Sequence, residues 1–164
     1  MRLRTFIVGT RQTIAGTVYG TIVVLSAVTA ASTVEHDLWH LAVIAAATVV
    51  IYWIAHVYSH GLGESLEAEH RLTAAELAAI ARRESSILRA AVLPVAAIVL
   101  GALGVFATRT ALWLAVGLGT AALAVQGLRY ARLERLSRTG TVVAVAINLA
   151  LALTIVLLKA LVAH

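Results

Sequence analysis

Five long apolar runs limit what this chain can fold into. They cover residues 13–32, 38–60, 87–107, 111–130 and 141–163. A bilayer core about 30 Å thick is crossed by roughly 20 helical residues at about 1.5 Å each, and each run reaches that length. None of the runs alternates apolar and polar residues as a barrel strand does. The sequence therefore predicts an all-α integral membrane protein: a single membrane domain over residues 1–164 that forms a five-helix transmembrane bundle.

The composition agrees with a membrane protein. The chain is 61% hydrophobic and 13% charged, whereas soluble domains are about 45–50% apolar and about 25% charged. It has no cysteine, which excludes disulfides and thiolate metal sites. The net charge of +5 comes from arginines that lie beside the apolar runs. Their positions indicate a lipid bilayer as the partner, and no nucleic acid is expected.

The first apolar run has two interpretations. Arg2, Arg4 and Arg11 resemble the basic start of a signal peptide, and Ala30 is a small residue suited to a cleavage site. However, the apolar core of a signal peptide spans about 7–15 residues, and this run is close to 20. Its length favours a retained membrane helix.

The basic residues alternate between the two ends of the predicted bundle. The first connector has none, the third has only Arg109, and the tail has Lys159. By the positive-inside rule, this pattern predicts a multi-pass protein of a bacterial inner membrane with its N-terminus in the cytoplasm and its C-terminus outside. The residues on the basic side are Arg2, Arg4 and Arg11, then Arg71, Arg82, Arg83 and Arg89, then Arg129, Arg132, Arg135 and Arg138.

The connector at residues 61–86 is the only sizeable segment outside the apolar runs. Its Thr73-Ala-Ala-Glu76 sequence has the spacing of a capping box, in which each of the two side chains bonds the other residue's backbone N–H. The connector is therefore expected to form a short cytoplasmic helix from Ala74 to about Arg83, between the second and third transmembrane helices.

Small and hydroxyl residues mark the first apolar run. Gly16 and Gly20 form a GxxxG pair, which lets helices approach closely, either within one bundle or across a homodimer. Thr17 and Thr21 lie one turn apart. They are candidates to line a pore, or they bond to the backbone of their own helix.

Five potential metal ligands follow the second apolar run. If its helix continues past residue 60, they fall within about 120° of arc on one face. Imidazole and carboxylate together suit Fe, Zn or Mn. Alternatively, Gly61 and Gly63 break the helix, and these residues are ordinary solvated surface. The five candidate ligands are His56, His60, Glu64, Glu67 and His70.

A second histidine pair, His36 and His40, lies with Glu35 and Asp37 between the first two runs. A short acidic loop needs no metal to explain it. No Ser-His-Asp set lies at a plausible depth, no phosphate-binding loop follows a strand, and no His-Glu-x-x-His motif occurs. The sequence therefore predicts a protein that is not an enzyme.

The stretch IAAATVVIYWIAHVYSHGLGESLEAEH, residues 44–70, resembles the vacuolar iron transporter family. The resemblance lies in Tyr58-Ser59 followed by Glu64, Glu67 and Glu69, together with the five-helix topology. It implies a second helix that leaves the membrane into a metal-binding module, and a dimer.

The expected function is divalent-metal binding or transport through the five candidate ligands. Two alternatives remain. One is a membrane scaffold or partner-binding subunit that uses the arginine-rich face and the Gly16/Gly20 surface. The other is a proton-coupled small-molecule transporter, for which His56 is the only titratable group near membrane depth.

Overall fold

The computed structural model describes residues 11–162, and this part of the chain is all-helical, without β-strands. Arg2 and Arg4, and the last residue of the fifth predicted run, lie outside the described residues. Because residues 11–162 are all-helical, the all-α prediction is confirmed for this part of the chain. The helices are α2 (Arg11–Ala31), α3 (Leu38–Ala68), α4 (Ala74–Arg83), α5 (Ser86–Ala102), α6 (Thr108–Leu133) and α7 (Arg138–Val162).

Within residues 11–162, four helices are long and apolar enough to cross a bilayer: α2, α3, α6 and α7. Helix α5 has 17 residues. It joins them as a fifth candidate if it forms one span with α4, from which it is bent by 47°.

Two helices end at other residues than the apolar runs that predicted them. The second run ends at residue 60, and α3 continues to Ala68, which is the continuation that the predicted ligand stripe requires. The third run reaches residue 107, and α5 ends at Ala102. The early end of α5 has a backbone cause. Gly104 adopts a left-handed conformation with φ 80°, and its N–H donates to the carbonyl of Gly101, which closes the helix.

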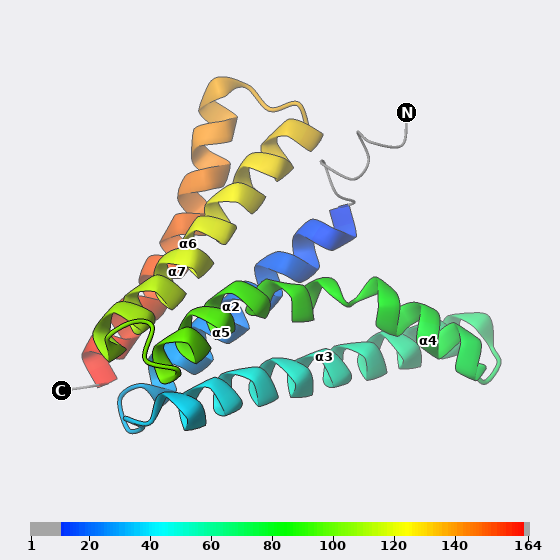
Figure 1. The fold of residues 1–164 in the computed structure, drawn as a ribbon. Coiled ribbons are helices and arrows are strands. Elements are labelled where there is room, and N and C mark those ends of the chain that lie inside the picture. The colour runs from blue at the N-terminus through cyan, green and yellow to red at the C-terminus, as the bar shows by residue number, and fades with distance from the viewer. Residues whose placement is uncertain (1–10, 163–164) are drawn as a thin grey trace.

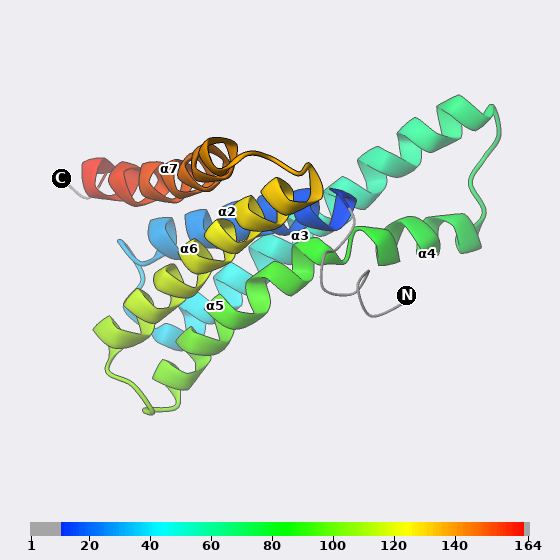
Figure 2. The ribbon, with the colours of Figure 1, turned by 90° about the horizontal axis from the view of Figure 1, so that it is seen from above.

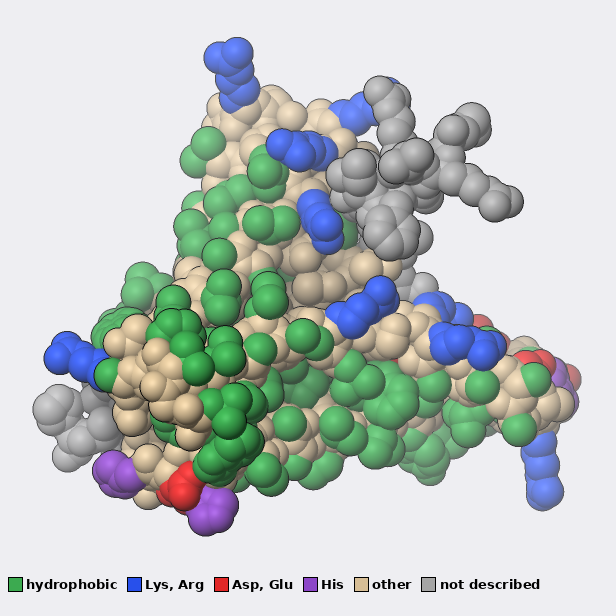
Figure 3. Space-filling view, in the orientation of Figure 1, with side chains coloured by type: hydrophobic (Ala, Val, Ile, Leu, Met, Phe, Trp, Pro, Cys, Tyr) green, Lys and Arg blue, Asp and Glu red, His purple; other side chains and the backbone are tan. Residues whose placement is uncertain are grey.

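The helices are close together at one end of the molecule and spread apart at the other (Figures 1 and 2). Helix α2 lies centrally and contacts α3, α5, α6 and α7. The α2–α3 and α5–α6 loops and the end of α7 lie at the close end. The start of α2, the α3–α4 turn and the α6–α7 loop lie at the spread end, where most of the Lys and Arg side chains visible in Figure 3 are found.

The glycine pair of α2 packs inside this bundle. A Cβ at Gly20 would lie 2.8 Å from the Cα of Ile87 and closer still to its carbonyl oxygen, so α2 and α5 touch backbone to backbone. Gly16 also faces α5, where it lies against the side chain of Ser86. A homodimer, which stays a proposal, would need another surface.

The threonines of α2 bond to their own helix. The Oγ1 of Thr17 donates to the carbonyl of Thr13, and the Oγ1 of Thr21 donates to the carbonyl of Thr17, each at 2.7 Å. Thr21 is fully buried. These bonds occupy both hydroxyl protons, so the geometry gives the two residues a role within α2, and their pore-lining role stays a prediction.

Candidate metal centre

Helix α3 carries the first part of the predicted ligand stripe without a break. Gly61 does not interrupt it, because the surface of this glycine is covered by the side chains of Leu72, Leu77 and Ile80. The helix ends only where Glu69 turns left-handed at φ 57°. His56, His60 and Glu64 therefore lie on consecutive turns of one face.

The two histidine rings lie against each other at a centroid distance of 4.5 Å. The ring of His56 also stacks on Tyr19 of α2 at 5.4 Å. Both side chains are partly exposed. The two rings therefore lie at the edge of the packed region, and the Tyr19 ring packs against His56.

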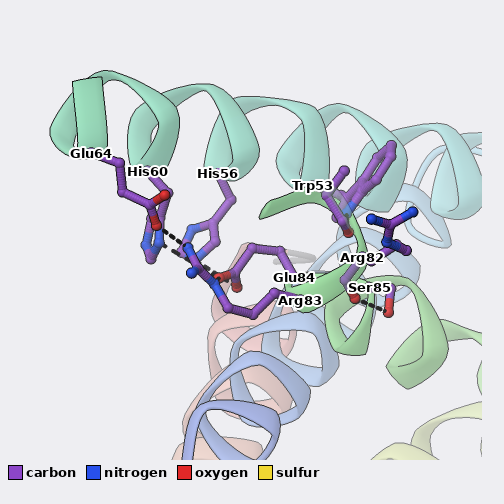
Figure 4. A network of polar contacts seen from close by, with 9 residues as sticks. Trp53, His56, His60, Glu64, Arg82, Arg83, Glu84 and Ser85 are labelled. Carbon is purple, nitrogen blue, oxygen red and sulfur yellow. Dashed lines mark hydrogen bonds and ion pairs between the residues drawn. The ribbon is translucent and has the colours of Figure 1, made fainter. Parts of the chain in front are cut away.

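A third ligand comes from the junction of α4 and α5. Glu84 is the C-cap residue of α4 and is 2% exposed. Its Oε2 lies 3.5 Å from Nε2 of His56, and its Oε1 lies 3.5 Å from Nδ1 of His60. Figure 4 shows the two imidazoles pointing from α3 toward this carboxylate.

The capping of α4 and its packing against α3 place Glu84 at this position. The predicted capping box is confirmed: Thr73 N–H donates to Glu76 at 2.7 Å, and Glu76 N–H donates to the Thr73 hydroxyl at 3.3 Å. Ile80, 1% exposed, packs α4 against α3. The indole N–H of Trp53 donates to the carbonyl of Ala81 at 3.3 Å and fixes the last turn of α4.

His56, His60 and Glu84 each offer one ligand atom, and these atoms lie within 4.8 Å of one another. A tetrahedral ion with bonds of about 2.1 Å holds its ligand atoms about 3.4 Å apart. The two histidine–carboxylate distances of 3.5 Å are close to this value, although each goes to a different oxygen of Glu84. Two histidines and one carboxylate are the donors of open catalytic zinc sites and of non-haem iron sites. Such a set leaves coordination positions for water or an exchanging ligand.

Arg83 lies beside this group. It forms an ion pair with Glu64, and its Nε lies 3.4 Å from Oε1 of Glu84. Glu64, a predicted ligand, is thus engaged by an arginine beside the group. The arginine and the histidines together balance the buried carboxylate, because a buried charge is stable only when it is paired.

The other two predicted ligands lie apart from the group. Glu67 is exposed and stands eleven residues beyond His56, about 16 Å along the helix axis. His70 lies beyond the end of α3, where its Nε2 is 3.5 Å from Glu76 and its Nδ1 is 3.1 Å from the carbonyl of Ala68. The five-residue stripe is therefore not one site in this structure.

These contacts raise the pKa of His70, first through the hydrogen bond to the Ala68 carbonyl and then through Glu76. A raised folded pKa adds stability below the unfolded pKa and loses it as the pH rises through the folded value. We expect an NMR titration to give His70 a pKa above 6.5. Glu76→Gln should lower it only in part, because the carbonyl contact remains. An unchanged value in the variant would contradict the contact.

The acidic residues beside the second histidine pair, His36 and His40, have structural contacts. Asp37 caps α3 by accepting from the N–H groups of Trp39 and His40 at 2.7 and 3.3 Å. Nδ1 of His40 lies 3.5 Å from Glu35. Among the side chains that the structure describes, the His56/His60/Glu84 group is the only set of three potential ligands this close together.

Sequence reasoning missed Glu84. A signal existed: it is the acidic residue nearest the third apolar run, which begins at Ile87. Its proximity to His56, 28 residues earlier, follows from the docking of α4 and has no local signature.

Comparison of this chain with models of known protein families, with curated proteins and with solved structures found no match.

Proposed function

We propose that this chain is an integral membrane protein that binds a divalent transition-metal ion at its arginine-rich end. Large apolar side chains that face outward support the membrane part of the proposal. Val43, Ile51 and Ile54 on α3, and Val142 and Ile147 on α7, are each more than half exposed. Contiguous apolar surface of this kind is disfavoured in water and suited to lipid.

The orientation is tested by reporter fusions. Helix α5 has 17 residues, the lower limit for a bilayer crossing. If α5 crosses by itself, there are five crossings, and α4 lies beside the cytoplasmic surface. An alkaline phosphatase fused after residue 164 should then be active outside the cytoplasm, and a fusion in the α6–α7 loop should be inactive. The reverse pattern, or an active phosphatase at both positions, would contradict the topology.

The observation that carries the metal proposal is the convergence of His56, His60 and buried Glu84 from two separate segments. Imidazole and carboxylate donors bind Zn²⁺ more tightly than Fe²⁺, and Fe²⁺ more tightly than Mn²⁺. Three protein ligands leave the ion exchangeable, which suits delivery or transport better than a structural role. The resemblance to the vacuolar iron transporters agrees with this class of cargo.

Calorimetric titration of the protein in lipid nanodiscs tests the proposal. We expect one Zn²⁺ per chain at micromolar affinity or tighter, with weaker binding of Fe²⁺ and Mn²⁺. Binding should fall as the pH drops, since protonated histidines cannot be ligands. No heat with any of the three ions, or an unchanged isotherm after His56→Ala with His60→Ala, would remove the metal site.

A further inference from the structure

Arg83, the last residue of α4, lies between two carboxylates (Figure 4). It forms an ion pair with Glu64 of α3, and its Nε lies 3.4 Å from Oε1 of Glu84. The side chain of Glu64 is 41% exposed, whereas that of Glu84 is 2% exposed. Arg83 therefore joins a carboxylate that water reaches to a carboxylate that water does not reach.

One oxygen of Glu84 faces both Arg83 and the candidate metal centre. This atom, Oε1, lies 3.4 Å from Nε of Arg83 and 3.5 Å from Nδ1 of His60. An ion bound to Oε1 at about 2.1 Å would lie no more than about 5.5 Å from Nε with Arg83 in this position. Like charges this close repel each other, and the repulsion is stronger where water is excluded. Arg83 and a bound divalent ion therefore compete for Glu84.

The contact with Arg83 stabilises Glu84 in the ion-free protein. A buried carboxylate is costly unless a positive charge and hydrogen bonds compensate it. A guanidinium keeps its charge at every physiological pH, so Arg83 is a permanently charged partner for Glu84. A divalent ion brings two positive charges to the same carboxylate. Once the ion is bound, Glu84 no longer needs the charge of Arg83.

The position of Arg83 allows it to move away from Glu84. Its side chain is 38% exposed, and so is much of its partner Glu64. Exposed ion pairs are weak and cost little free energy to rearrange. Glu64 lies one helical turn beyond His60 on α3. It can therefore keep the guanidinium close to the centre after the contact with Glu84 is lost.

We propose that Arg83 is an internal counter-cation of the metal centre. It compensates Glu84 while no ion is bound, and an incoming divalent ion displaces it from Glu84 toward Glu64. This inference rests on the proposed metal site and adds that one cation is exchanged for another at each binding event. The exchange weakens ion binding, because the contact between Arg83 and Glu84 is lost, and it makes release of the ion easier.

Arg83→Gln tests the proposal, with Zn²⁺ titrated by calorimetry into the full chain in phosphatidylcholine nanodiscs. We expect the affinity for Zn²⁺ to rise at least about tenfold, because the competing charge is gone. The zinc-free variant should at the same time melt at a lower temperature than the wild type, because Glu84 has lost a compensating charge. A merely structural role for Arg83 predicts that affinity and melting temperature both fall.

Two further variants separate charge from structure. Arg83→Lys keeps the positive charge, so its affinity for Zn²⁺ should stay within about threefold of the wild type. Arg82→Gln makes the same chemical change one residue earlier, at a side chain that lies apart from the two histidines in Figure 4. Its affinity should equal that of the wild type. A tenfold rise in Arg82→Gln as well would mean that only the net charge of α4 matters, which would overturn the proposal.

A measurement on the wild type needs no variant to fold. In protein with ¹⁵N-labelled arginine, the Nε–H signal of Arg83 should shift when Zn²⁺ binds, and that of Arg82 should not. An unchanged Arg83 signal at saturating Zn²⁺, or an affinity in Arg83→Gln that is equal to or weaker than the wild type, would overturn this inference and leave the metal site standing. Absence of Zn²⁺ binding by the wild type would remove the metal site and this inference together.

Discussion

Replacing Glu84 with glutamine is expected to lower the affinity for Zn²⁺ by at least about 100-fold. Changes to groups that only support metal ligands cost about 10–100-fold, and Glu84 contributes the one carboxylate of the proposed centre. Glutamine has nearly the same size, but its amide carries no charge and is a poor ligand. The measurement is the calorimetric titration of wild type and variant in nanodiscs at one pH.

Glu67→Gln is the matched control for this experiment. It makes the same chemical change on α3, at an exposed residue apart from the group. Its affinity for Zn²⁺ should match that of the wild type. Equal losses of affinity in both variants would mean that Zn²⁺ binds to acidic surface residues in general and not at a defined centre. A loss confined to Glu67→Gln would favour the stripe predicted from sequence over the centre found in the structure.

Gly20→Val is expected to destabilise the fold by about 3 kcal/mol or more, at the upper end of overpacking effects. The added side chain would overlap the backbone of Ile87, which cannot move aside as a flexible side chain can. Helix α5 would have to shift, and Glu84 lies just before its first residue, Ser86. Zn²⁺ affinity should therefore fall together with the melting temperature, although Gly20 contacts no proposed ligand.

Gly63→Ala provides the control for the glycine change. Gly63 lies in α3 with nothing within 4 Å of an added Cβ. Alanine is favoured over glycine in a helix interior by about 0.5–1 kcal/mol, so this variant should be slightly more stable than the wild type. Similar melting temperatures for the two variants would mean that the α2–α5 approach is looser than the structure describes.

The helices were predictable because their signals are local. Runs of apolar residues indicate helices of bilayer length, and the Thr73/Glu76 capping box sets the start of α4 through contacts three residues apart. The end of α3 was harder to predict. Glycines alone suggest a break, but the outcome depends on what packs against them, and Gly61 is covered by residues that follow the α3–α4 turn.

The sequence by itself determined that the chain is helical, where most of its helices lie, and that His56 and His60 share a face, because a helix repeats every 3.6 residues. Only the tertiary structure decided which carboxylate joins them. Glu64 and Glu67 are nearer in sequence, yet Arg83 engages the first, and the second lies too far along the helix. Glu84 reaches the histidines because α4 folds back on α3 and is held there by Ile80 and Trp53, contacts between distant segments that no local pattern encodes.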